Sequence, residues 1–454
     1  MSISDERPCP ESRAAKARFH VRVDPALAED SMRSTGWTLL SMLLLVVPLR
    51  GEETPILALR AAAAIDVERG TRTERAVVLV RGDRIAAIGA DLPVPPGARV
   101  VDLGRATLLP GLFDVHTHLL LRLDPALGDA SLILQLASAE PGSRVLLGAA
   151  MAREMLEAGF TTVRDLGNSG RDGDVALRDA IRQGWVPGPR MIVSTRALAP
   201  PGGQFGRLSA LARGFAAEDY AEVTGVDAAR RAVREAVFEG AAAIKVIVDG
   251  VTSLAPAELE AIVDEAHRAG LKVAAHATGD AAVRSAARAG VDSIEHAYSA
   301  PEDALRTMAE KRIFLVPTDY PREGQKEPDA EVVAGRKRLA LAIELGVPIA
   351  AGSDAYFGFR GMTRGEAAKR MFRAYADAGM TSARILRAAT IDAARLLGVD
   401  REVGSLEAGK IADLLAIDGD PLADVAALGR VRMVMQAGAI VVPSGPAAAG
   451  SPRP

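Results

Sequence analysis

The chain is nearly devoid of the residue that forms disulfides and thiolate sites. Its 454 residues include one cysteine, Cys9. An intramolecular disulfide is therefore excluded, and a cysteine-ligated metal site is disfavoured. Aromatic residues make up 4% of the sequence and the formal net charge is −3, so no basic patch favours nucleic acid or an anionic membrane. A metal site in this chain is expected to use His, Asp, Glu or Lys.

Apolar runs long enough to span a bilayer are also missing. The run at 37–47 has about 11 residues, whereas a membrane-spanning helix needs about 20. It follows Met32 and Arg33, as the apolar part of a signal peptide would. We therefore predict a disordered leader at 1–51 that contains a signal peptide at 32–51. The expected protein is exported, periplasmic or secreted, without a stable membrane anchor. A buried helix in a cytoplasmic protein is the alternative.

Short β-like runs occupy both flanks of the remaining chain. Two of them, 76–80 and 84–89, surround the turn Arg81-Gly82-Asp83. Further runs follow at 99–102, 431–436 and 440–442. The pattern predicts a small composite β-sandwich built from residues 52–106 and 404–443. The tail at 444–454, rich in Pro, Gly, Ser and Ala, is predicted to be disordered.

Between the flanks, apolar runs alternate with helical segments. The first predicted strand ends near residue 118, and the other seven are 160–165, 190–194, 243–248, 272–277, 293–296, 313–317 and 347–350. Predicted helices include 226–239, 256–269 and 280–289, each followed by a glycine stop. Eight strands that alternate with helices predict an α/β fold, a (β/α)8 TIM barrel over 107–403.

Two histidines mark the end of the first predicted strand. An apolar run at 106–109 leads into Pro110-Gly111-Leu112-Phe113-Asp114-Val115-His116-Thr117-His118. On a strand, residues i and i+2 point to the same face, so His116 and His118 project together and are spaced to reach one metal ion. Asp114 precedes the pair in the same strand and is interpreted as structural or as a group that orients a ligand.

Other polar residues stand at the ends of later predicted strands. Lys245 lies in strand four, His276 and His296 end strands five and six, and Asp354 follows strand eight. Four of the six histidines of the chain thus fall at the ends where barrel enzymes carry their chemistry. For Lys245, a simple ion pair with Asp249 or Asp165 remains the alternative to a site role.

This pattern resembles the metal-dependent amidohydrolase superfamily. The resemblance spans residues 56–442 and includes the His-Thr-His strand and the closing Gly-Ser-Leu-Glu-Ala-Gly-Lys-Ile-Ala-Asp-Leu at 404–414. Within the superfamily, the sequence most resembles the imidazolonepropionase-like and metal-dependent Xaa-Pro dipeptidase (prolidase-like) branch. The resemblance implies two divalent ions, expected to be Zn²⁺, and an N6-carboxylated Lys245 that bridges them. The implied ligands are His116, His118, Lys245, His276, His296 and Asp354.

The implied reaction is hydrolysis of a C–N amide bond by a metal-bridged hydroxide, with Asp354 as the proton carrier. The expected substrates are small molecules or dipeptides: Xaa-Pro or other dipeptides and N-acyl amino acids. A cyclic amidase, a lactonase or a deaminase remains the alternative, and a silent scaffold is the third hypothesis. Homo-oligomer formation stays open.

Candidate substrate contacts lie in the loops that follow the strands. Relatives of this branch often carry a His after Gly-Gly where this chain has Gln204, and this difference leaves the substrate open. Two cations, Arg207 and Arg360, are candidates for a substrate carboxylate. The tyrosines Tyr298 and Tyr320 follow strands six and seven.

Overall fold

The computed structural model describes residues 55–127, 130–205, 207–250, 252–321 and 330–442. The predicted leader at 1–51, its signal peptide at 32–51 and the tail at 444–454 lie outside these residues. Within the described part of the chain, none of the helices is both long and apolar enough to cross a membrane.

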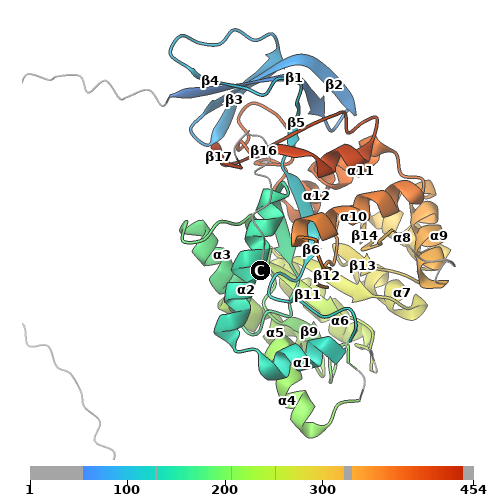
Figure 1. Ribbon diagram of the computed structural model, residues 1–454. Helices are drawn as coiled ribbons and strands as arrows, with labels where there is room; N and C mark the ends of the chain where they lie inside the picture. Colours follow the sequence, from blue (N-terminus) through green and yellow to red (C-terminus); the bar gives the residue numbers. More distant parts are fainter. Residues whose placement is uncertain (1–54, 128–129, 206, 251, 322–329, 443–454) are drawn as a thin grey trace, which may run out of the picture. The chain divides into compact units, whose positions relative to one another are not determined.

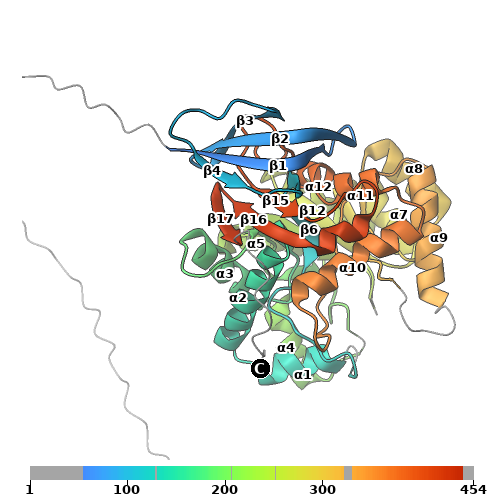
Figure 2. The same cartoon turned by 45° about the horizontal axis from the view of Figure 1, so that its top comes forward.

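The two flanks of the sequence share one eight-stranded sheet, as Figure 1 shows. Its strands are β1 (Ile56–Asp66), β2 (Thr71–Arg81), β3 (Arg84–Ala90), β4 (Arg99–Asp102), β5 (Thr107–Pro110), β15 (Leu414–Ile417), β16 (Val431–Gln436) and β17 (Ala439–Val442). The predicted turn at Gly82 joins β2 to β3, with Arg81 opposite Arg84. The first and last parts of the chain meet where β5 pairs antiparallel with β15, and Figure 2 shows blue and red strands side by side.

The middle of the chain is an α/β unit of parallel strands. One sheet contains β6 (Leu112–Thr117), β7 (Phe160–Asp165) and β8 (Arg190–Val193). A second contains β9 (Ala197–Ala199), β10 (Tyr220–Glu222), β11 (Ala243–Ile247), β12 (Lys272–Ala277), β13 (Ser293–His296) and β14 (Phe314–Val316). On one side, a backbone hydrogen bond from Ala242 N, just before β11, to Val193 O of β8 (2.7 Å) connects the two sheets. On the other side, Val115 N of β6 donates to Ala351 O (2.9 Å), just after the segment 347–350 that forms a bridge to β14.

Helices connect these strands and pack against them. They are α1 (Ala130–Ser138), α2 (Pro141–Glu157), α3 (Gly173–Arg182), α4 (Ala210–Asp219), α5 (Val226–Glu239), α6 (Pro256–Arg268), α7 (Asp280–Ala289), α8 (Glu302–Lys311), α9 (Ala330–Glu344), α10 (Arg364–Asp377), α11 (Ser382–Ala388) and α12 (Ile391–Leu397), and a short 3-10 helix spans Val425–Gly429. Helices α5 to α7 match the predicted ranges to within one residue, because each ends at a glycine in the left-handed region or just before one.

Two predicted strands differ from the structure. The apolar run at 106–109 does not continue into the histidine strand: β5 belongs to the eight-stranded sheet, and Gly111 separates it from β6. The predicted eighth strand, 347–350, forms one isolated parallel bridge, Leu315 to Ile349. It is an extended segment whose hydrogen bonds to β14 and β6 are too few to form a regular ladder.

Candidate active site

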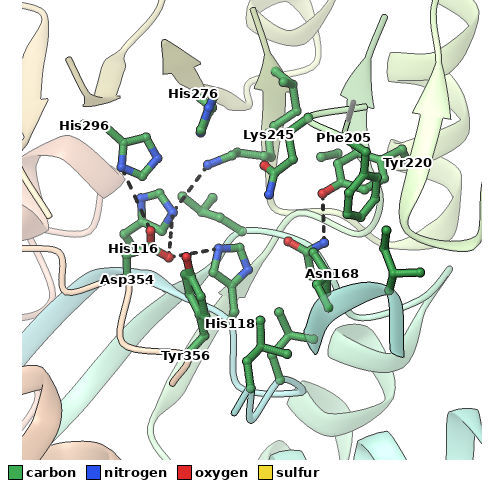
Figure 3. Close-up of a pocket in the computed structure, with 18 of the residues that line it drawn as sticks. His116, His118, Asn168, Phe205, Tyr220, Lys245, His276, His296, Asp354 and Tyr356 are labelled. Carbon is green, nitrogen blue, oxygen red and sulfur yellow. Dashed lines mark hydrogen bonds and ion pairs between the residues drawn. The ribbon is translucent and has the colours of Figure 1, made fainter. Parts of the chain in front are cut away.

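The six predicted ligands come together in the wall of one cavity of about 550 Å³. His116 lies in β6, Lys245 in β11 and His276 in β12, while His296 is the last residue of β13. His118 and Asp354 follow β6 and the extended segment at 347–350. The residues converge because the C-terminal ends of parallel strands meet at one edge, and Figure 3 shows their side chains facing one another.

A close backbone approach brings Asp354 to His116. A Cβ atom at Gly352 would lie 2.8 Å from the Cβ of His116 and 2.4 Å from Val316 Cγ1, so only glycine fits there. Two residues later, the backbone N–H of Asp354 donates to His116 O at 2.8 Å. Asp354 and His296 both have positive φ, 52° and 68°. Such strained backbone is held only where the surrounding contacts fix it.

In three imidazoles, the hydrogen-bond partner of Nδ1 determines which ring nitrogen carries the proton. The carbonyl oxygen of Gly167 lies 2.8 Å from His118 Nδ1 and a carboxylate oxygen of Glu295 lies 2.7 Å from His116 Nδ1. Both oxygens accept, so each Nδ1 carries the proton. The hydroxyl of Thr318 donates to Pro317 O and therefore accepts from His296 Nδ1 at 2.8 Å. All three rings are left with a free lone pair on Nε2.

Burial favours the neutral form of the His116, His276 and His296 imidazoles. It lowers the pKa of His116 and of His296 well below the usual value, and the charge of Lys245 lowers both further. Burial likewise lowers the pKa of His276 to about 4. Burial opposes the charge of Asp354, but His116, His118 and Lys245 outweigh it, so the pKa of Asp354 is lowered. The site thus presents neutral imidazole nitrogens and a carboxylate.

Lys245 is buried among these groups. Its Nζ lies 3.4 Å from His116 Nε2, and burial lowers its pKa to about 8 against the opposing charges of Glu295 and Asp354. The two alternative partners bind elsewhere. Asp249 accepts from Thr278 and Gly279, and Asp165 accepts from Thr117, Leu119 and Ser169. Among the described residues, the Lys245 amine therefore contacts His116, a predicted metal ligand, and neither of the two carboxylates.

The donor set fits a divalent cation. Oδ1 of Asp354 is buried without a hydrogen-bond partner among the described residues, yet it lies 3.3 Å from His118 Nε2 and 3.6 Å from His116 Nε2. These nitrogens are lone-pair acceptors, so acceptors face each other, which a cation between them would resolve. One ligand atom each from His116, His296 and Asp354 lie within 4.8 Å of one another.

Comparison with known proteins identifies the family of this chain. The family model of the Amidohydrolase family matches residues 107–441. The chain belongs to the amidohydrolase family. Ochratoxinase of Aspergillus niger is 30% identical over 396 residues, 77% of this chain and 79% of that protein. Imidazolonepropionase of Pseudomonas aeruginosa is 26% identical over 393 residues, covering 80% and 92%.

A solved structure extends the comparison to the whole fold. It is a prolidase complexed with N-methylphosphonate-L-proline, with a TM-score of 0.74 and 29% identity, covering 85% of this chain and 99% of that chain. The predicted resemblance to the imidazolonepropionase-like and prolidase-like branch is confirmed. This amidohydrolase is therefore a hydrolase that acts on C–N bonds, in a superfamily that generally uses metal ions.

The sequence alone did not predict a buried hydrogen-bond network around Glu295 that contacts the predicted ligand His116. One carboxylate oxygen of Glu295 accepts from His116. The other accepts from Arg164 at 2.9 Å and from Ser293 at 2.5 Å. Arg164 also donates to Val115 O at 2.7 Å. Ligating histidines are commonly oriented by such carboxylates. The available signal was a charged residue within each of two short strands, Arg164 in β7 and Glu295 in β13, because a buried charge needs a partner.

Replacing Glu295 by Gln is expected to lower the free energy of unfolding by about 3–5 kcal/mol, since it leaves the Arg164 charge buried without its partner. Urea unfolding measures the change. The matched control is Glu302→Gln, which removes an exposed ion pair with Arg306 and is expected to cost about 0–1 kcal/mol. Equal stability of the Glu295→Gln variant and the native protein would show that this pair does not support the site.

The predicted substrate contacts divide into two groups. Gln204, Arg207 and Tyr298 line the cavity. Arg360 and Tyr320 do not. Arg360 is exposed, and the Tyr320 ring packs against the main hydrophobic core. Sequence position past a strand does not decide which way a loop turns, so a role of these two residues as substrate contacts stays a prediction that the cavity lining does not support.

Proposed function

We propose that this amidohydrolase cleaves the amide bond of a dipeptide or an N-acyl amino acid. The observation that carries the proposal is the group of Nε2 atoms around Asp354 Oδ1 in the wall of the cavity. Arg207, in the same wall, supplies a cation for a substrate carboxylate. We also propose that the two parallel sheets, joined by single hydrogen bonds, form the (β/α)8 barrel of residues 107–403, beside a domain made from 52–106 and 404–443.

The proposed site holds two divalent ions, with Zn²⁺ preferred. His116 and His118 would hold one, His276 and His296 the other, and Asp354 and a carboxylated Lys245 would complete the set. When bound, such ions supply Lewis acidity, which polarises a carbonyl and makes hydroxide available near neutral pH. Two observations support this assignment: the His116 and His296 rings are neutral and keep a lone pair for a metal, and the pKa of the Lys245 amine is lowered.

The chain's own residues then move the proton. Asp354, ionised because its pKa is lowered, accepts a proton from the attacking water and returns it to the leaving nitrogen as the C–N bond breaks. Glu295, Gly167 O and Thr318 hold the rings of His116, His118 and His296 in the tautomer that leaves Nε2 free. Burial of the group excludes bulk water from all but the cavity side.

The free carboxylate of the substrate is expected to raise kcat/KM. A hydrolysed dipeptide should lose about tenfold in kcat/KM when its C-terminus is amidated, because a charge-assisted contact with Arg207 is lost. In the Arg207→Ala variant the gap between free acid and amide should narrow. The measurement is kcat/KM for matched free-acid and amide substrates.

Arg360→Ala is the matched control, since that arginine is exposed and does not line the cavity. It should leave the gap unchanged. Equal rates for acid and amide in the native protein would reject carboxylate recognition and favour the cyclic amidase, lactonase or deaminase alternative.

A further inference from the structure

The cavity has a second, apolar half beyond Lys245. Figure 3 shows the histidines and Asp354 on one side of Lys245, and Phe205, Tyr220 and Asn168 on the other. Side chains from four separate segments of the chain wall this half. They include Leu121, Leu123, Leu132, Phe205, Leu208 and Ile247.

These residues belong to their own hydrophobic cluster, separate from the main core of the fold. Leu121 and Leu123 follow β6, Leu132 comes from α1 and Ile247 from β11. Such a cluster is not required to pack helices onto the parallel strands. Apart from the half-buried Leu208, these side chains are already nearly buried, and the surface that they turn to the cavity is apolar, as in pockets that take an apolar ligand group. Their position therefore indicates an apolar ligand group.

The wall of this half is preformed. The rings of Phe205 and Tyr220 pack edge to face, with centroids 5.7 Å apart. Asn168 donates to the Tyr220 hydroxyl at 3.0 Å, and its backbone carbonyl accepts from Arg144 at 2.5 Å. Arg144 is in turn paired with the buried Asp219 at 3.1 Å. A wall fixed in this way loses little entropy when a ligand group packs against it.

Arg207 connects the apolar half to the substrate's polar end. It lies two residues from Phe205 and next to Leu208, and all three line the cavity. In an amino acid the carboxylate and the side chain leave the same carbon atom. An amino-acid portion whose carboxylate meets Arg207 would therefore place its side chain against Phe205 and Leu208.

We propose that the apolar half of the cavity binds the side chain of the amino acid released from the substrate. The substrate class is then N-acyl derivatives of aromatic or branched aliphatic amino acids. This inference rests on the proposed function, which it narrows from amides in general to amides whose leaving amino acid is bulky and apolar.

The test compares kcat/KM for N-acetyl-L-phenylalanine, N-acetylglycine and N-benzoylglycine. The native protein should prefer N-acetyl-L-phenylalanine over N-acetylglycine by at least about tenfold, as expected for filling an apolar pocket. Phe205→Ala should reduce this preference by about tenfold. Leu208→Ala, at a half-buried position, tests the same wall if Phe205→Ala does not fold. Phe238→Ala, at a side chain that is 92% exposed, is the matched control and should leave the preference unchanged.

The outcomes separate this inference from the proposed function. A preference below about twofold in the native protein would overturn the apolar subsite. Preference for N-benzoylglycine without preference for N-acetyl-L-phenylalanine would overturn the assignment to the released amino acid. If none of the three is hydrolysed, the proposed function fails, and calorimetric binding to the native protein decides the subsite. Tenfold tighter binding of N-acetyl-L-phenylalanine than of N-acetylglycine supports it, and equal binding overturns it.

Discussion

Asp354→Asn should lower kcat by about 10²–10⁴-fold, the usual contribution of a positioned general acid and base. The amide cannot accept the proton that the Asp354 carboxylate takes from water. It retains a carbonyl oxygen, however, so most of the bound metal should stay. Steady-state kinetics and elemental analysis of the same preparation test both parts of the expectation.

Asp174→Asn is the control for this variant. Asp174 is fully buried and does not line the cavity, and burial raises its pKa to about 7. An uncharged side chain at that position therefore resembles a state that the native protein already populates near neutral pH. The control should keep near-native turnover. Near-native turnover in Asp354→Asn itself would remove this residue from the mechanism.

The strand pattern was sufficient to predict where the ligands lie. His116, His276 and His296 stand at or near the ends of apolar runs, and the ends of parallel strands meet at one edge of the fold. The position of these residues followed from the two-residue period of a strand and the alternation of strands with helices, whereas their role as ligands was implied by the resemblance to the amidohydrolase superfamily. The structure accordingly brings all six predicted ligands to one cavity.

The groups that orient those ligands were not predictable in the same way. Glu295 is adjacent in sequence to His296, but it contacts His116, and its ion-pair partner is Arg164. These contacts join three different strands, so they depend on how the strands are arranged in space. Loop residues behave similarly: Arg207 reaches the cavity whereas Arg360 does not, although both follow strands. Pairing across the fold and the path of a loop are set by tertiary packing, which one sequence does not encode locally.

The carboxylates of Glu295 and Asp354 also affect the protonation of Lys245. Glu295 and Asp354 both favour the charged form of Lys245, while burial favours the neutral amine and lowers its pKa to about 8. A neutral amine is the form that adds carbon dioxide to give a carbamate. The same burial that makes an ammonium costly here therefore favours the modified, anionic side chain once cations are bound nearby.

Removing Lys245 should have the second large effect. Lys245→Ala is expected to lower the metal content from about two ions per chain to about one or fewer, because the ligand proposed to be shared by both ions would be lost. Activity should fall by about a thousandfold, since metal-ion catalysis supplies several kcal/mol and each 1.4 kcal/mol is a factor of ten. Elemental analysis of protein purified without chelator measures the metal content, and steady-state kinetics measure the activity.

Lys369→Ala is the matched control for this experiment. Lys369 is a half-buried lysine whose pKa is lowered by burial to about 7, but it donates to Leu428 O and does not line the cavity. Its variant should keep the native metal content, and reloading its metal-free form with Zn²⁺ should be accelerated by bicarbonate as in the native protein. Lys245→Ala should lack that bicarbonate dependence, because no amine remains to carry the carbamate. A native content of one ion that is insensitive to Lys245→Ala would instead favour a mononuclear site in which Lys245 only balances charge.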